Sequence, residues 1–250
     1  MSKVASPASA GRWITGRVAR GTARVRLIGL PQAGGGAGAF RSWRRHLPDG
    51  LELAPVELPG RGTREAEPIP ERFEDLVEAL LAGTRAERDM PYALFGHSFG
   101  AVLAYELALR AETAPLCLIV SASRAPHLPA ERRMSGAAEP ELLRWLAETG
   151  GLPPELLEYP DFLRQVLAPI RRDMAFAEGY LVAEPTPVTC PLYACAAADD
   201  QVITAEQVAC WAGCTTADFR SLIFPGGHSF PSTSPAELVA VIADAVGTAR

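Results

Sequence analysis

The stretch Leu94–Ala101, LFGHSFGA, places Ser98 between two glycines. A short apolar run precedes it, and residues 101–110 follow with apolar side chains at helical spacing. We therefore predict a strand, a sharp turn and a helix, which is the setting of a nucleophile elbow. In such a turn, side chains at the two glycine positions would collide with the strand and the helix. Ser98 is the candidate nucleophile, and the alternative is a glycine–serine turn without chemistry.

Composition limits the class of protein. A chain of 250 residues fits one α/β domain or two small ones, and 48% apolar with 21% charged residues is typical of a globular protein. The net charge of -5 gives no nucleic-acid footprint, and four histidines are too few and too scattered for a metal cluster. Five cysteines, an odd number without a CxxC pair, predict reduced thiols in the cytoplasm.

The N-terminal region carries six basic residues and no acidic residue before position 27. This composition resembles a transit peptide superficially, but its glycines argue against a continuous amphipathic helix. We expect residues 1–20 to form a flexible head that leads into a first strand with arginine on an exposed edge. No apolar run reaches the length that spans a membrane, so we expect no membrane association.

Strands and helices are predicted to alternate along most of the chain, which indicates a mostly parallel sheet with helices on both faces. We expect strands at 25–30, 51–58, 92–95, 115–121, 188–196 and 220–224, and helices at 39–47, 72–84, 101–110, 205–211 and 235–246.

Residues 127–187 interrupt this alternation. Only helical segments are evident there, at 139–148, 154–157 and 162–180, and about 60 residues is far more than a plain crossover needs. We expect a core built from residues 21–126 and 188–250, with 127–187 as a helical lid.

A serine nucleophile needs a base, and the base needs an orienting acid. In the elbow setting the chain order is serine, acid, histidine. His228 fits because it lies in FPGGHSF, a glycine-rich loop after a late strand. The other histidines fit less well: His97 adjoins Ser98, His46 precedes the elbow, and His127 comes too early for the expected order.

The acid should end a strand between Ser98 and His228. Asp199 and Asp200 follow the apolar run 192–198, and only one of them can hold the imidazole. The other could cap the helix that begins near residue 204 or face water. We favour Asp200 as the orienting acid.

Two backbone N–H groups are needed to stabilise a developing oxyanion. One is expected from Phe99, the residue after the nucleophile. The other is expected from Ala33 in the loop PQAGGGAGAF, residues 31–40. A glycine-rich loop can also cradle phosphate, but this one lacks both the P-loop ending and the GxGxxG order.

Six segments together resemble the type II thioesterases, which are stand-alone α/β-hydrolases that accompany polyketide synthases and nonribosomal peptide synthetases. They are PQAGGGAGAF, ELPGRGTRE, FGHSFGA, RRDMAFAEGY, ADDQVITAEQVACW and FPGGHSF. The resemblance covers nearly the whole chain after about residue 12. Gln32 stands where the family usually has an aromatic residue or histidine, and Ala197 where it has glycine. Gln32 is therefore expected in the substrate pocket beside the oxyanion hole.

The resemblance implies an α/β-hydrolase fold and hydrolysis of acyl thioesters on the phosphopantetheine arm of carrier proteins. Such enzymes clear stalled or misprimed synthases. Ser98 would attack, His228 would transfer the proton and Asp200 would orient His228. The partners would be acyl or peptidyl carrier domains, and the enzyme would act as a monomer. No cofactor or metal is expected, because the substrate itself carries the phosphopantetheine.

Two other functions are compatible with the sequence. One is a different serine α/β-hydrolase, an esterase or acyltransferase acting on a small soluble ester. The other is a binding module that kept the fold without catalysis, although all three catalytic positions are occupied. Because carrier proteins of this kind are usually acidic, a local basic patch would have to dock them. The candidates are Arg17, Arg20, Arg24, Arg26, Arg41, Arg44 and Arg45, with Arg132, Arg133 and Arg144 as the next choice.

Overall fold

The computed structural model describes residues 13–19 and 21–247, so most of the predicted head lies outside the described residues. Six strands form one sheet in the order β2-β1-β3-β4-β5-β6, and every neighbouring pair is parallel. The predicted parallel sheet is therefore confirmed. The strands are β1 (Val25–Leu30), β2 (Leu51–Pro55), β3 (Tyr92–His97), β4 (Leu118–Ser121), β5 (Leu192–Ala197) and β6 (Phe219–Phe224).

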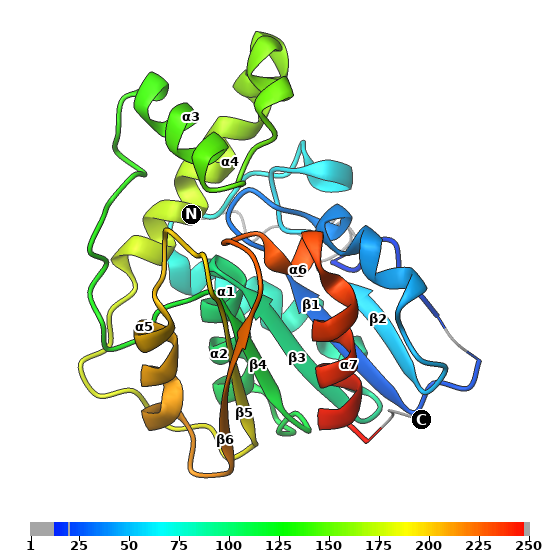
Figure 1. The fold of residues 1–250 in the computed structure, drawn as a ribbon. Coiled ribbons are helices and arrows are strands. Elements are labelled where there is room, and N and C mark those ends of the chain that lie inside the picture. The colour runs from blue at the N-terminus through cyan, green and yellow to red at the C-terminus, as the bar shows by residue number, and fades with distance from the viewer. Residues whose placement is uncertain (1–12, 20, 248–250) are drawn as a thin grey trace, which may run out of the picture.

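Both faces of the sheet are covered, because successive side chains of a strand point to opposite sides. In β3, Leu94 packs into the core on one face, whereas Ala93 and Phe95 pack into the core on the other. Figure 1 shows the helices on either side of the sheet. The first face carries α1 (Phe73–Gly83), α2 (Phe99–Arg110), α5 (Ala205–Ala209) and η6 (Cys210–Cys214), and the second carries η2 (Ala37–Arg45), α6 (Phe230–Thr233) and α7 (Pro235–Ala245).

The segment predicted as a helix at 39–47 is a 3₁₀ helix, η2. Phe40 and Trp43 are its buried side chains. Residues three apart lie on the same side of a 3₁₀ helix, so this form turns both rings toward the sheet. There they pack edge-on against each other and against Phe95 of β3.

The expectation that arginine of the first strand lies on an exposed edge is wrong. β1 pairs with β2 on one side and β3 on the other, so it is an inner strand. The Arg26 side chain is 11% exposed, and its guanidinium pairs with Glu52 of β2 and with Asp89, the latter at 2.6 Å. Arg17 also pairs with Glu52, at 3.1 Å.

The segment 127–187 connects β4 to β5 and contains α3 (Glu139–Glu148), η5 (Pro154–Glu158) and α4 (Pro160–Gly179). Figure 1 shows α3 and α4 beyond one end of the strands. These helices have a core of their own, which comprises Met134, Leu142, Leu146, Leu152, Leu163, Leu167, Ile170 and Met174. We call residues 127–187 the helical insertion.

The strand order determines where a site can form. The chain runs from β1 outward to β2 and then returns past β1 to β3. The loops that follow β1 and β3 therefore leave the same edge of the sheet side by side, at the switch point where open α/β sheets bind ligands. The loops after β5 and β6 leave that same edge because all strands are parallel.

Candidate active site

The predicted strand, turn and helix around Ser98 are present. Ser98 links β3 to α2 with φ +54° and ψ -116°, in a region that residues other than glycine rarely adopt. A Cβ on Gly96 would lie 2.1 Å from the carbonyl oxygen of Gly100, and one on Gly100 would lie 2.2 Å from that of Leu30. Any side chain at either position would clash with backbone, so the strand and the helix can approach this closely only because both residues are glycine.

Asp200 and His228 meet behind the pocket. The Nδ1 atom of His228 lies 2.9 Å and 3.2 Å from the two carboxylate oxygens of Asp200, whose side chain is 1% exposed. Oδ1 of Asp200 also accepts hydrogen bonds from the amides of Val202 and Ile203, at 2.7 and 3.2 Å. Burial alone would raise the pKa of Asp200, but the hydrogen bonds from His228 and the two amides lower it below its ordinary value.

An ionised carboxylate can only accept hydrogen bonds, so Nδ1 of His228 carries the proton. Nε2 is then the unprotonated nitrogen and can act as a base. His228 lines the same pocket as Ser98. Ser98, Asp200 and His228 are thus the candidate nucleophile, orienting acid and base, in that chain order.

Asp199 lies apart from His228. Its side chain is exposed, and its amide donates to the carbonyl of Gly226 at 2.9 Å. The N-terminus of α5 is capped by Thr204, whose hydroxyl and the Gln207 side chain form a reciprocal capping box. Asp199 therefore faces water and does not cap the helix that begins near residue 204.

His97 is buried beside the site, a position that the sequence pattern did not reveal. Its Nδ1 lies 3.2 Å from the hydroxyl of Ser121, and its ring centre lies 5.2 Å from that of His228. Burial, with the nearby His228, lowers the pKa of His97 to about 3. His97 is therefore a neutral neighbour of His228 at physiological pH.

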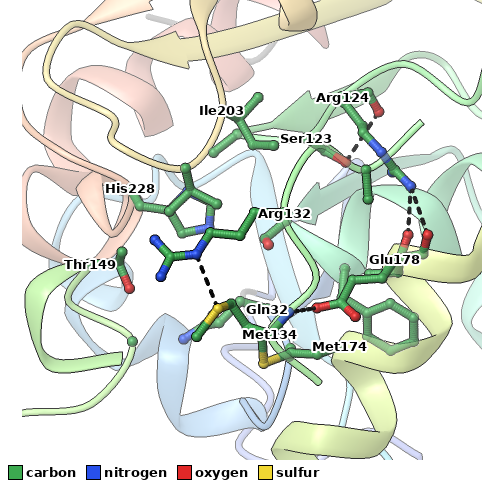
Figure 2. A pocket seen from close by; sticks show the side chains of 18 of the residues that line it. Gln32, Ser123, Arg124, Arg132, Met134, Thr149, Met174, Glu178, Ile203 and His228 are labelled. Carbon is green, nitrogen blue, oxygen red and sulfur yellow. Dashed lines mark hydrogen bonds between the residues drawn. The ribbon is translucent and has the colours of Figure 1, made fainter. Parts of the chain in front are cut away.

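A cavity of about 340 Å³ brings the predicted site residues together, and Figure 2 shows part of its lining. The helical insertion contributes apolar side chains to the cavity, namely Met134, Trp145, Leu146, Ile170 and Met174, beside the charged side chains of Glu131, Arg132 and Glu178. The apolar side chains suit an acyl chain. The other side is formed by Gln32, Ala33, Ser98, Phe99 and His228, and Asp200 supports His228 from behind.

The loop after β1 is a tight turn beside Ser98. The amide of Gly35 donates to the carbonyl of Gln32 at 2.9 Å, with Ala33 and Gly34 at the centre of the turn. Gly34 has φ +71°, the sign required at the third position of a type II turn. Phe99 begins α2, where the first amides of a helix have no partner within it. The two predicted oxyanion donors, Ala33 and Phe99, thus line the same pocket as Ser98.

Two charged residues near this loop are not among the site residues that the sequence predicts. Asp173 of α4 is fully buried and accepts a hydrogen bond from the amide of Gly34 at 2.8 Å. Arg61 is buried against Asp173. Both lie in segments that carried the family resemblance, ELPGRGTRE and RRDMAFAEGY, and that was the available signal.

Within residues 13–19 and 21–247, no group of three or more histidine, cysteine, aspartate or glutamate side chains is arranged to hold a metal ion. In the same described ranges, no helix combines the length and apolar character needed to cross a bilayer.

The thioesterase domain family model matches residues 25–245. Linear gramicidin dehydrogenase LgrE of Brevibacillus parabrevis is 32% identical over 94% of this chain and 92% of its own. RedJ, a thioesterase of the prodiginine pathway of Streptomyces coelicolor, is 36% identical with a TM-score of 0.83 over 89% and 91% of the two chains. The type II thioesterase BorB of the borrelidin cluster is 30% identical with a TM-score of 0.82 over 96% and 98%. The fold, the buried elbow and these likenesses lead to one conclusion: the chain belongs to the thioesterase family, is a thioester hydrolase, and is one of the type II thioesterases with the α/β-hydrolase fold.

Proposed function

We propose that this thioesterase removes acyl groups from the phosphopantetheine arm of carrier domains and so clears stalled or misprimed synthases. The observation that carries the proposal is the cavity of about 340 Å³, in which Ser98 and His228 face the apolar side chains of the helical insertion, with Asp200 behind His228. The biosynthetic settings of RedJ and BorB support the choice of carrier-bound substrates.

Acylation begins when Oγ of Ser98 attacks the thioester carbonyl and its proton moves to Nε2 of His228. The carbonyl oxygen becomes an oxyanion, which the amides of Ala33 and Phe99 stabilise. Asp200 stabilises the imidazolium that forms. The C–S bond then breaks, and the pantetheine sulfur leaves with the proton from His228.

Deacylation repeats these steps with water. His228 removes a proton from a water molecule, the hydroxide adds to the acyl-serine carbonyl, and the same two amides hold the second oxyanion. When the ester bond breaks, Ser98 recovers its proton from His228 and the carboxylic acid is released. Every group returns to its starting state, so these residues suffice without a cofactor.

The basic patch for carrier docking is narrower than the sequence suggested. Arg17 and Arg26 are already paired with acidic side chains, whereas Arg24, Arg41, Arg44 and Arg45 are exposed. Arg20 lies outside the described residues. Arg44 and Arg45 are exposed on η2, whose chain leads directly out of the loop beside Ser98. We propose η2 as the docking site.

The five unpaired cysteines support the proposal that the enzyme works in the cytoplasm.

The test compares two substrates that carry the same hexanoyl group, one on a holo acyl carrier protein and one on N-acetylcysteamine. The proposal expects kcat/KM to be at least about tenfold higher for the carrier substrate. It also expects an acyl adduct on Ser98, detected by mass spectrometry of trapped enzyme. A preference for hexanoyl ethyl ester over both thioesters would instead favour an esterase of small soluble esters.

A further inference from the structure

The loop beside Ser98 is held by charged side chains from two distant parts of the chain. Asp173 of α4 accepts from the amide of Gly34 at 2.8 Å. Nη1 of Arg61 lies 3.3 Å from the carbonyl oxygen of Gly35. Glu57 accepts from the amide of Ala37 at 3.4 Å. The backbone just after Ala33 is thus fixed at three points.

Arg61 and Asp173 hold each other as well as the loop. The two ends of the guanidinium contact the two oxygens of the carboxylate, Nη2 at 3.1 Å from Oδ1 and Nη1 on Oδ2. Their side chains are 7% and 0% exposed. A buried pair of this kind keeps its geometry only when both partners stay in place, since Asp173 without Arg61 would be an uncompensated buried charge.

The loop also packs closely against α4 at Gly34. A Cβ on Gly34 would lie 2.1 Å from Cγ1 of Ile170, one turn before Asp173. The loop therefore sits directly against the helical insertion, with no room for a side chain between them. The Gly34 amide belongs to the peptide unit that follows Ala33, so its hydrogen bond to Asp173 fixes that peptide plane. The Ala33 amide belongs to the preceding peptide unit, whose Gln32 carbonyl accepts from the Gly35 amide at 2.9 Å, so the turn holds the two planes together.

We infer that Asp173, supported by Arg61, is a positioning residue for the oxyanion hole and couples it to the docking of α4. The inference rests on the proposed function, in which the Ala33 amide holds the oxyanion. Displacing α4 would withdraw Asp173 from Gly34 and leave the Ala33 amide unfixed. Hydrolysis would then be fast only while the insertion covers the acyl chain.

The test removes both charges together, in the double variant Arg61→Leu with Asp173→Leu, so that neither is left buried alone. It measures hydrolysis of hexanoyl-N-acetylcysteamine and inhibition by 1,1,1-trifluorodecan-2-one. Oγ of Ser98 adds to the carbonyl carbon of the ketone while the serine proton moves to Nε2 of His228, and the carbonyl oxygen becomes the oxyanion of a tetrahedral adduct. Its affinity therefore reports on the oxyanion hole itself, independently of turnover.

We expect kcat to fall about 10- to 100-fold with KM within threefold of the parent, and the ketone affinity to fall by the same factor as kcat. The matched control is Arg171→Leu on the same helix, because Arg171 anchors α4 to the carbonyls of Ser135 and Ala137 and not to the oxyanion loop. In that control kcat and ketone affinity should stay within about threefold.

A conservative variant, Arg61→Lys, keeps the charge beside Asp173 and serves if the double variant does not fold. It loses the fixed fork of the guanidinium and should lower kcat and ketone affinity together by about 3- to 10-fold at an unchanged melting temperature. Unchanged ketone affinity in a folded variant, or a rise in KM alone, would overturn the inference. Failure of the parent enzyme to form the ketone adduct at Ser98 would instead reject the proposed function.

Discussion

The Nδ1 atom of His228 and the carboxylate of Asp200 are joined at 2.9 Å, and the same carboxylate caps the turn that follows β5 through the amides of Val202 and Ile203. Asp200 therefore has two tasks, to orient the imidazole and to order its own loop. Removing the charge should affect both.

Replacing Asp200 by Asn should be far more damaging than the same change at Asp199. Loss of the orienting carboxylate in a serine triad costs about 10⁴-fold in kcat. Asp199 is exposed, and it is Asp200 that pairs with His228, so substitution of Asp199 should change kcat by less than about threefold. Steady-state hydrolysis of hexanoyl-N-acetylcysteamine by both variants is the measurement. Equal and mild effects would mean that another acid orients His228.

Ser98→Ala and Ser98→Gly should both abolish the acyl adduct while leaving the fold intact. The two variants should differ in stability, because the φ of +54° strains alanine and not glycine. Backbone strain of this kind costs about 1–3 kcal/mol, against about 0.4–1 kcal/mol of extra chain entropy for glycine. We expect Ser98→Gly to be the more stable by about 1 kcal/mol in urea unfolding. A clearly more stable alanine variant would show that the turn is relaxed.

The burial of His97 predicts a specific loss of stability in acid. Its pKa falls from 6.5 to about 3 on folding, so below pH 6.5 the unfolded chain binds a proton that the folded chain does not. As the pH is lowered from 6.5 toward 3, the free energy of unfolding therefore decreases by up to about 1.4 kcal/mol per pH unit. His97→Asn removes this term. Urea titrations between about pH 4.5 and 6.5 should give a flatter profile for the variant, and parallel profiles would contradict the assignment.

Docking through η2 predicts an effect that depends on the substrate. Glu in place of both Arg44 and Arg45 should raise KM for hexanoyl carrier protein and weaken its salt dependence, since exposed charges act through screened attraction. Hydrolysis of the N-acetylcysteamine thioester should stay nearly unchanged. If both substrates suffer alike, the arginines support the fold or pocket. If neither changes, the carrier binds elsewhere, and the surface near Arg132, Arg133 and Arg144 should be tested next.

The helical insertion should exchange its backbone amides faster than the sheet does. Its helices pack mainly on a core of their own, whereas β3 is buried between two strands and two helical layers. Native-state hydrogen exchange measures the difference. Equally slow exchange in 139–179 and in the strands would show that the insertion is not a mobile lid.

Local patterns made much of this structure predictable. The glycines around Ser98 show a turn without room for side chains, and the order of Ser98, Asp200 and His228 follows from the sequence of strands and loops. The choice between Asp199 and Asp200 depended on which side chain points to the imidazole. The structure shows that it is Asp200.

Long-range contacts were not readable in the same way. Asp173 and Arg61 lie 112 residues apart, and charged residues are usually exposed, so nothing local marks them as a buried pair. The inner position of β1 depends on the order in which strands assemble, which no single segment encodes. The 3₁₀ form of η2 likewise depends on packing of Phe40 and Trp43 against β3.

The position of the helical insertion has a consequence for redesign. It joins β4 to β5, whereas Ala33, Ser98, Asp200 and His228 follow β1, β3, β5 and β6. The segment that supplies the apolar lining of the pocket can thus be exchanged between related enzymes without cutting any loop that bears these four residues. A chimera should inherit the chain-length preference of its donor, but retain speed only if the graft keeps an acid at position 173 facing Gly34. Turnover of a series of acyl-N-acetylcysteamines would show whether preference and speed separate in this way.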